Sequence, residues 1–303
     1  MVCQLSVVIV NWRNEERTLR CVSHLTGWAI LNPHILVVDN ESTEISREVL
    51  AKALDANGLI CSDVNLGYSG GNNLGIERAL HGRAPFILLL NNDAMIAEKD
   101  AIRLLHRLRD NPDVSILGPV LNEYHSDSVR SYIGGTDIVR NSGTRQSADR
   151  EALSDVPGHP LIDVDYVPGA VFLARRSVFE QIGLLDEQFF FSGEIADLCK
   201  RIRDSGQRVC VDLEVEARHD ANETPPTLRD TLYVYYSLRN RLLYAKKHHR
   251  LERNKYLGFW WKLCLAELGK ALAQGRLRKA HAISLAILHG CTNRFGNQNA
   301  AFL

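Results

Sequence analysis

The strongest constraint on the fold is an apolar strand that ends abruptly in polar residues. Phe86–Leu90 contains no charge and is followed at once by Asn91, Asn92 and Asp93. A short apolar run is typical of a strand covered on both faces by helices, as in a parallel sheet. Ligands of open α/β sheets bind beyond the carboxyl ends of such strands, where oxygen ligands suit a hard divalent cation. Taken alone, the pattern is more often a strand that leads into an Asn/Asp turn.

Two earlier apolar runs end in the same way. Leu5–Val10 ends at Asn11, and Ile35–Val38 ends at Asp39 and Asn40. Segments with helical spacing separate these runs, and strands that alternate with helices predict βαβ units and a mostly parallel sheet. The polar residues at the strand ends should therefore converge at one edge of the sheet. This convergence favours a nucleotide-type site over isolated turns.

The second half of the chain has a looser pattern and then a helical end. Gly134-Gly135 and residues 141–155 are expected to form a loop or hairpin over the site. A short strand is expected at Arg208–Val211, and the chain should be helical from Leu228 onwards.

The net charge of zero conceals an asymmetry. Residues 1–229 contain 23 Lys and Arg against 33 Asp and Glu, whereas residues 230–303 contain 13 against 3. The helical end can be a covering bundle whose Trp260 and Trp261 are core, or a platform on an anionic membrane surface. Nucleic-acid binding is not expected, because no reader motif is present. We favour the membrane surface, because the balance of +10 in residues 230–303 is hard to explain otherwise. Seven cations of this segment are expected to form a dense cationic face: Arg239, Arg241, Lys246, Lys247, Arg250, Arg253 and Lys255.

The cysteines and the apolar runs predict the compartment. Seven scattered cysteines include no pair at C-x-x-C spacing, so neither a zinc site nor a disulfide framework is indicated. The chain begins almost directly on a strand, which leaves no room for a signal peptide, and no apolar run is long enough to span a membrane. We expect a cytoplasmic protein, bound peripherally to the inner face of the cytoplasmic membrane if the basic end is a membrane platform.

The chain contains a series of short motifs in a fixed order. The motifs are Ser6–Asn11, Val37–Ser42, Asn65–Gly75, Leu89–Asp93, Gly169 to Gly183, Leu185–Glu187, Glu194 to Cys199 and Arg239-Asn240. Each motif is weak alone, but the ordered set, which covers at least residues 5–245, resembles family 2 glycosyltransferases. The branch that it is similar to makes bacterial surface polysaccharides and includes many rhamnosyltransferase-like proteins.

The resemblance implies a GT-A fold, which is a Rossmann-like, mostly parallel sheet flanked by helices, here with a C-terminal helical extension. It implies a catalytic domain at residues 1–227, with a nucleotide-binding half at 1–115 and an acceptor and catalytic half at 116–227. Residues 228–303 would be the basic amphipathic extension. The reaction implied is transfer of a sugar from a dTDP- or UDP-linked donor to a lipid-linked or polysaccharide hydroxyl, with inversion at the anomeric carbon.

The resemblance also assigns residues to the donor and to a Mg²⁺ or Mn²⁺ ion. Asp39 would contact the nucleotide base, and Asp93 and His219 would lie at the metal and diphosphate. Each has an alternative, because Asp39 can cap a helix, His219 can be an ordinary loop histidine, and the glycines can serve turns and packing. The remaining donor-binding candidates are Asn11, Ser42, Asn65, Gly67, Gly71, Asn72, Asn91 and Asn92.

Two departures from the family pattern affect the chemistry. Asn91 stands where the metal motif usually begins with Asp, so one charge is missing. Ile195 stands at the second carboxylate position of the family's Glu-Asp-x-Asp, which makes Glu194 the first candidate base and Asp197 the second. Asp197 can instead pair with Arg201, one helical turn on. The alternative function is therefore a catalytically impaired nucleotide-sugar-binding or scaffold protein of a polysaccharide assembly complex.

Overall fold

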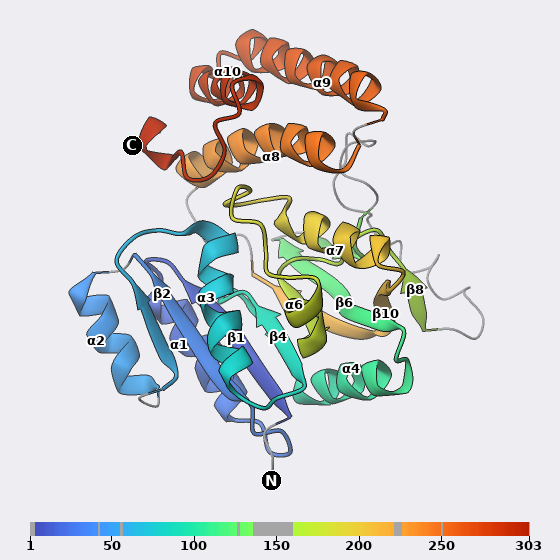
Figure 1. Ribbon diagram of the computed structural model, residues 1–303. Helices are drawn as coiled ribbons and strands as arrows, with labels where there is room; N and C mark the ends of the chain where they lie inside the picture. The colour runs from blue at the N-terminus through green and yellow to red at the C-terminus, as the bar shows by residue number, and fades with distance from the viewer. Residues whose placement is uncertain are drawn as a thin grey trace.

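The computed structural model describes residues 4–41, 43–54, 57–125, 128–135, 160–220, 226–249 and 251–302. An α/β body carries the N-terminus, and three helices are stacked on one end of it (Figure 1). The N-terminal half alternates strands and helices in this order: β1 Leu5–Asn11, α1 Glu15–Thr26, β2 His34–Asn40, α2 Glu44–Ala53, β3 Leu59–Ser62, α3 Gly67–His81, β4 Phe86–Leu90, β5 Ala94–Ile96 and α4 Glu98–Asp110.

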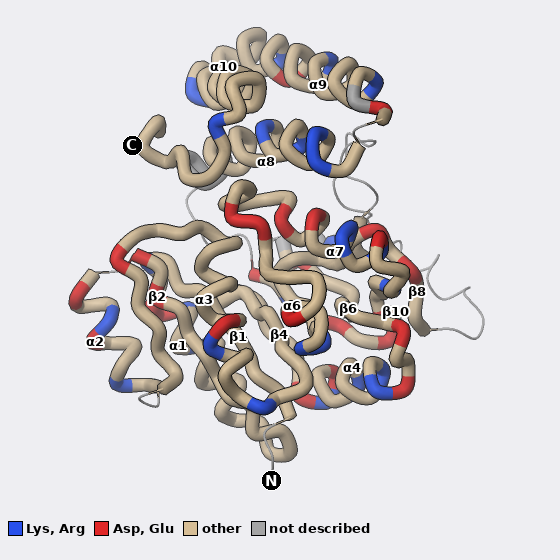
Figure 2. Tube along the Cα trace, in the orientation of Figure 1, with Lys and Arg blue, Asp and Glu red and all other residues tan. Residues whose placement is uncertain are grey.

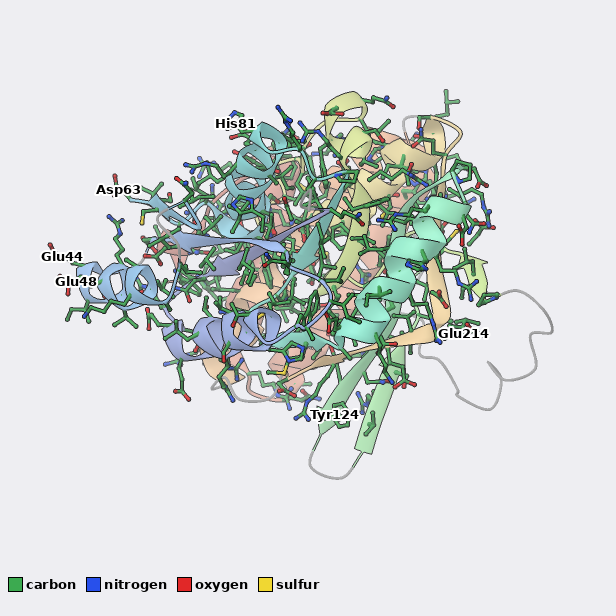
Figure 3. The ribbon with its side chains drawn as sticks, turned by 90° about the horizontal axis from the view of Figure 1, so that it is seen from below. Glu44, Glu48, Asp63, His81, Tyr124 and Glu214 are labelled. Carbon is green, nitrogen blue, oxygen red and sulfur yellow. The ribbon has the colours of Figure 1, made fainter. Side chains whose placement is uncertain are left out.

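The second half continues the same sheet before the chain becomes helical. Its elements are β6 Val114–His125, β7 Ser128–Tyr132, β8 Leu161–Asp163, β9 Val171–Arg175, α6 Arg176–Gln181, α7 Glu194–Asp204, β10 Arg208–His219, α8 Pro226–His248, α9 Arg253–Ala273, α10 Leu277–Cys291 and the short 3₁₀ helix Asn299–Ala301. The β6–β7 hairpin projects from the body, with Tyr124 towards its end (Figure 3). The expected loop at 141–155 lies outside the described residues.

The described strands form one mixed sheet in the order β3-β2-β1-β4-β9-β6-β10-β5, with β7 and β8 paired to its second half. The α/β fold class is confirmed, but the sheet is not mostly parallel. Strands β3, β2, β1 and β4 are parallel, whereas β9 runs antiparallel to both β4 and β6. The parallel pattern is interrupted at β9, and the next pair, β6 and β10, is parallel again.

Side chains of alternate residues face opposite sides of the sheet, and each side is covered by helices. Val7 and Ile9 pack with α1, α2 and α4, whereas Val8 packs with α3, α6 and α7. The apolar run Phe86–Leu90 is buried on both faces, as predicted. The sheet therefore holds its strand ends rigidly, between two layers of helices.

The C-terminal helices are joined to the body by α8, which lies between the body and α9–α10 (Figure 1). Ala196 of α7 and Leu243 and Tyr244 of α8 belong to one apolar cluster, together with Phe189. Trp260 is buried, as the covering-bundle interpretation predicts, but Trp261 is 39 % exposed. No described helix is both long and apolar enough to cross a bilayer.

The prediction of a dense cationic face is wrong for the four of its cations that lie on α8, whereas Lys255 of α9 is exposed. Lys and Arg do outnumber Asp and Glu in the three helices (Figure 2). However, Arg239 and Arg241 are buried, and Lys246 and Lys247 point to partners within the protein. The side chains of residues 250 and 253 lie outside the described part. These α8 cations therefore serve internal contacts, and an exposed basic surface must be sought on α9 and α10.

Candidate functional site

The carboxyl ends of β1, β2 and β4 meet in a chain of buried hydrogen bonds. Asn11 Nδ2 donates to Asp39 Oδ1 at 3.1 Å, and the Thr18 hydroxyl donates to Asn11 Oδ1 at 2.7 Å. Asn92 Nδ2 donates to Thr18 Oγ1 at 3.0 Å. The predicted convergence of strand ends is thus observed, and it depends on Thr18 of α1, which carries no sequence signal of its own.

Asp39 is fully buried beneath Arg47. Its Oδ2 atom makes no hydrogen bond and lies 3.8 Å from Nε of Arg47, which also contacts Asp63. Asp39 does not cap α2, because the N-cap is Thr43, whose side chain accepts a hydrogen bond from the Ser46 amide. Ser42, the other residue expected beside Asp39, lies outside the described residues. A buried carboxylate oxygen without a donor is a position at which a ligand N–H can bind once Arg47 moves.

The stretch Asn65–Gly75 has a Gly/Asn-rich composition typical of a loop, but from Gly67 onwards it is helix α3. Gly67 has φ +71° at the start of α3, where a Cβ would lie 2.4 Å from the carbonyl oxygen of Phe190. A Cβ on Gly75 would lie 2.2 Å from Val8, so α3 can approach β1 this closely only with glycine there, and a Cβ on Gly71 would lie in tight contact, 3.0 Å from Val10. The alternative in which these glycines serve turns and packing is therefore confirmed.

The asparagines of this stretch also have structural partners. Asn65 Oδ1 accepts hydrogen bonds from the Gly67 amide at 2.8 Å and from Asn40 Nδ2 at 3.3 Å. Asn72 Nδ2 donates to the carbonyl of Tyr68 at 2.9 Å. These bonds fix the start of α3 against the end of β2. The structure thus gives Gly71 and Asn72 roles in packing the helix, away from the cavity described below.

Asp93 and His219 come together where β10 passes the segment after β4. His219 pairs with Ala94 in the sheet, and its Nε2 lies 3.2 Å from Asp93 Oδ1. Arg17 Nη1 lies 3.5 Å from the other carboxylate oxygen of Asp93. His219 is buried at the end of a strand, so its interpretation as a surface-loop histidine is wrong. The predicted strand Arg208–Val211 is the first part of this longer β10.

A second carboxylate orients the His219 ring. His219 Nδ1 lies 3.1 Å from Glu123 Oε1, and Glu123 is itself buried in β6. Burial opposes protonation of His219, but hydrogen bonds to Asp93 and Glu123 outweigh it and raise the pKa of the imidazole to about 9. Sequence reasoning missed Glu123, because its role depends on the pairing of β6 with β10.

The donor set at Asp93 fits a divalent cation. Nε2 of His219 and Oδ1 of Asp93 lie 3.2 Å apart, so both atoms could reach one cation placed between them. Carboxylate oxygen with imidazole nitrogen suits Mn²⁺, and metal binding would displace the imidazole proton. No set of three or more His, Cys, Asp or Glu in the described part of the chain is arranged to hold a metal. A cation at Asp93 and His219 would therefore need oxygen ligands from its substrate.

A cavity of about 240 Å³ opens beside this pair and is lined by Asn91, His219 and Glu194. Glu194 is the first residue of α7 and is 6 % exposed. Its burial, together with the charge of Asp197, raises the pKa of the carboxyl to about 7. Aromatic side chains line much of the remaining wall, namely Tyr68, Tyr132, Tyr166, Phe191 and Tyr233.

Asp197 has the opposite environment. Oδ2 accepts a hydrogen bond from Arg201 Nε at 2.9 Å, and Oδ1 lies 2.7 Å from both Lys247 Nζ and His248 Nε2. Burial alone would raise the pKa of Asp197, but His248, Lys247 and Arg201 lower it to about 2. The predicted pair with Arg201 is confirmed, and Asp197 is too weak a base to serve at neutral pH.

The unusual Ile195 packs into the body of the protein. It is 4 % exposed and belongs to the apolar cluster that includes Val167 and Leu198. A Cβ on Gly169 would lie 3.2 Å from its side chain, so little space remains around it. The site therefore has one carboxylate in the cavity at this position, that of Glu194.

Comparison with known proteins identifies relatives along the whole chain. The model of the family described as Glycosyl transferase family 2 matches residues 6–183. The hexosyltransferase Agl10 of low-salt glycan biosynthesis in Haloferax volcanii is 30 % identical over 302 residues, which are 98 % of this chain and 94 % of that protein. The dTDP-rhamnosyl transferase RfbF of Shigella flexneri is 23 % identical over 256 residues, which are 82 % of each chain.

Solved structures agree in fold. GalNAc-T7 with UDP, GalNAc and Mn²⁺ superimposes with a TM-score of 0.58 at 16 % identity, over 80 % of this chain and 51 % of that one. The mannosyltransferase PcManGT of Pyrobaculum calidifontis, with GDP-Man and Mn²⁺, gives 0.56 at 12 % identity, over 97 % and 88 %. The expected GT-A fold is therefore confirmed.

The two carboxylates of α7 should differ in their effect on stability. Asp197→Asn leaves Arg201 and Lys247 without their buried counter-charge and should lower the free energy of unfolding by about 3 kcal/mol. Glu194→Gln removes a carboxylate that is already difficult to ionise and should change it by less than about 1 kcal/mol. Urea unfolding measures both, with exposed Glu180→Gln as the control. Equal losses in all three variants would contradict this assignment.

Proposed function

The chain belongs to glycosyltransferase family 2, and from this premise we propose that it transfers a sugar with inversion from a dTDP- or UDP-linked donor to an acceptor hydroxyl. The acceptor would be a lipid-linked glycan or a polysaccharide. Relatives support this choice of donors, because one is named a dTDP-rhamnosyl transferase and a structural neighbour was solved with UDP. Direct displacement needs a base for the acceptor proton, a way to neutralise the departing diphosphate, and an oriented acceptor.

The position of Glu194 is the observation that carries the proposal. Its carboxyl lies in the same cavity as Asn91 and His219, and its pKa of about 7 suits a general base near neutral pH. Asp197 cannot compete for this role because its cations hold it ionised with little affinity for a proton. Glu194 would accept the proton of the acceptor hydroxyl as that oxygen attacks the anomeric carbon.

We further propose that Asp93 and His219 hold Mg²⁺ or Mn²⁺ together with diphosphate oxygens of the donor. The metal would neutralise charge on the departing nucleoside diphosphate. Arg17, 3.5 Å from Asp93, adds a fixed positive charge beside this position. Asn11 and Asp39 would contact the base, with Asn91 and Asn92 near the sugar and phosphates. Only one of the three residues Asn91, Asn92 and Asp93 is a carboxylate, so this motif would supply a single negative charge to the metal.

The alternative, a nucleotide-sugar-binding scaffold without turnover, is motivated by Ile195. Ile195 does remove one carboxylate from the usual pattern, but it does so by packing into the apolar core. Glu194 beside it retains a buried, ionisable carboxyl in the cavity. The enzyme is therefore the proposal that the site supports best.

A membrane-surface role is proposed for α9. Its outward side carries Trp261, Leu265 and Leu272, which are 39 %, 57 % and 55 % exposed. Lys262 and Lys270 are exposed on the same helix, next to this apolar stripe. An exposed stripe of this kind beside lysines suits an anionic bilayer surface. The protein would then work at the cytoplasmic face of a membrane, where a lipid-linked acceptor is available.

Glu194→Gln should lower kcat at least about a hundredfold, because the amide cannot accept the acceptor proton. The donor KM should change little. In the wild type, kcat should rise with pH through about 7, since the base must be ionised. Release of nucleoside diphosphate across a set of donors, with Glu180→Gln as the control, measures both. Tight donor binding without turnover in the wild type would instead establish the scaffold.

Asp93→Asn should raise the Mn²⁺ concentration needed for half-maximal activity at least about tenfold, because the only carboxylate of the motif is lost. Calorimetry of Mn²⁺ binding in the presence of the nucleoside diphosphate provides a reading independent of turnover. Asp110→Asn, exposed at the end of α4, is the matched control. Equal metal requirements in the two variants would refute a metal at Asp93.

Leu265→Glu should lower binding to anionic vesicles about tenfold, because it replaces exposed apolar surface with a charge of the same sign as the lipid. Binding of the wild type should also weaken as salt increases. Sedimentation with phosphatidylglycerol vesicles measures both, and Ile45→Glu on α2, 75 % exposed, is the control. A wild-type protein that ignores such vesicles at low salt would exclude the membrane platform.

A further inference from the structure

Two consecutive residues of α8, Arg239 and Asn240, donate hydrogen bonds to backbone carbonyls of the segment that leads into Glu194. Asn240 Nδ2 lies 2.7 Å from the carbonyl oxygens of both Phe189 and Ser192, and 2.9 Å from that of Phe191. Arg239 donates to the Phe189 carbonyl at 3.1 Å and orients Asn240 through a 2.9 Å hydrogen bond. Both side chains are buried, and the Arg239 guanidinium lies against aromatic rings of Tyr235, Tyr236 and Phe295.

This segment, residues 189–193, has an unusual backbone conformation. Phe190, Ser192 and Gly193 have φ values of 62°, 72° and 102°, and Glu194 follows immediately as the first residue of α7. Non-glycine residues in this region are strained and persist only where the surroundings fix them. No side chain caps the start of α7. The bonds from Asn240 and Arg239 to these carbonyls, together with the Ser69 amide that donates to the Phe190 carbonyl at 3.2 Å, hold the backbone that positions Glu194.

Two turns further along, α8 also neutralises the neighbour of Glu194. Lys247 Nζ bridges Asp197 Oδ1 and Asp186 Oδ2, at 2.7 Å from each, and His248 Nε2 lies 2.7 Å from the same Asp197 oxygen. Asp197 is one helical turn from Glu194, so its negative charge opposes ionisation of that carboxyl. The other titratable groups that line the cavity with Glu194 are Tyr68, Tyr132, Tyr166, His219, Tyr233 and Arg241.

We infer that α8 is part of the catalytic apparatus: Asn240 is a positioning residue for Glu194, and Lys247 sets the electrostatic environment of Glu194 by neutralising Asp197. The inference rests on the proposed role of Glu194 as the base. It gives Asn240, from the Arg239-Asn240 motif, and Lys247, one of the cations of the basic extension, roles inside the enzyme that do not depend on a membrane. It also makes the C-terminal helices necessary for turnover and not only for location.

Lys247→Met tests the electrostatic part in the full-length protein. With less positive charge beside Asp197, Glu194 should ionise at higher pH, and the acidic limb of the kcat–pH profile should move up by roughly half a pH unit. The donor KM should stay within about twofold, because Lys247 is remote from the strand ends. Lys247→Arg should restore the wild-type limb.

Lys246→Met is the matched control. It removes the same charge from the adjacent position, but Lys246 Nζ binds the Gly290 carbonyl and Asn293 instead of α7. The inference would be overturned if the acidic limb of the kcat–pH profile stayed in place in Lys247→Met, or if it moved equally in Lys246→Met. If Glu194→Gln keeps the wild-type rate, the proposed base itself fails, which is a separate and distinguishable result.

Asn240→Leu tests the positioning part. Loss of the three carbonyl bonds should free the backbone before Glu194 and lower kcat at least about tenfold, with the donor KM nearly unchanged. Circular dichroism and thermal unfolding would show whether the variant is folded. A folded Asn240→Leu protein with wild-type kcat would overturn the positioning role, and if the variant does not fold the Lys247 series decides the inference.

Discussion

The site depends on the contact between the end of β10 and the segment that follows β4. His219 pairs with Ala94, and the Asp220 amide donates to the Asp93 carbonyl at 2.8 Å. These bonds join the two halves of the sheet at the point where the first half ends in polar residues. Without these bonds, Asp93 would lie in a turn after β4 with no contact to β10, and His219 would no longer form part of the cavity wall. The two halves of the sheet therefore meet at the residues that form the candidate site.

The electrostatics of α7 separate two carboxylates that lie one turn apart. Glu194 faces a cavity with little compensation for its charge, whereas Asp197 is surrounded by Arg201, Lys247 and His248. Burial raises the pKa of both carboxyl groups, so the difference in pKa comes from the cationic partners of Asp197. Two of these partners, Lys247 and His248, belong to α8. Pairs of groups with such divergent proton affinities mark acid–base assignments in many enzymes. If Glu194 is the base as proposed, this separation gives it a suitable proton affinity without a carboxylate at Ile195.

The sequence predicted the features that depend on local pattern. The strands at β1, β2 and β4 and the convergence of their polar ends follow from apolar runs and alternation, and the ordered motifs pointed to Asp93, His219 and Glu194. It failed where tertiary contacts decide. The stretch from Asn65 to Gly75 looks like a loop because glycine disfavours helices, yet α3 needs those glycines to approach β1 and Phe190. The antiparallel direction of β9 could not be predicted for the same reason, since it depends on pairing with β4 and β6, which come from distant parts of the chain.

The charge asymmetry between the two parts of the chain shows that composition does not reveal where charged side chains lie. A count of Lys and Arg cannot distinguish an exposed basic face from cations that enter the protein, and α8 contains the second kind. Arg239 lies among carbonyls and aromatic rings, and Lys247 reaches a buried aspartate, so their burial is compensated by partners from distant segments. Among the described residues of the C-terminal helices, exposed cations remain on α9 and α10, such as Lys262, Lys270 and Arg278. Because α8 touches both α7 and α9, a membrane-bound α9 and a base held by α8 would be rigidly related, and the acceptor cavity would keep a fixed orientation to the bilayer.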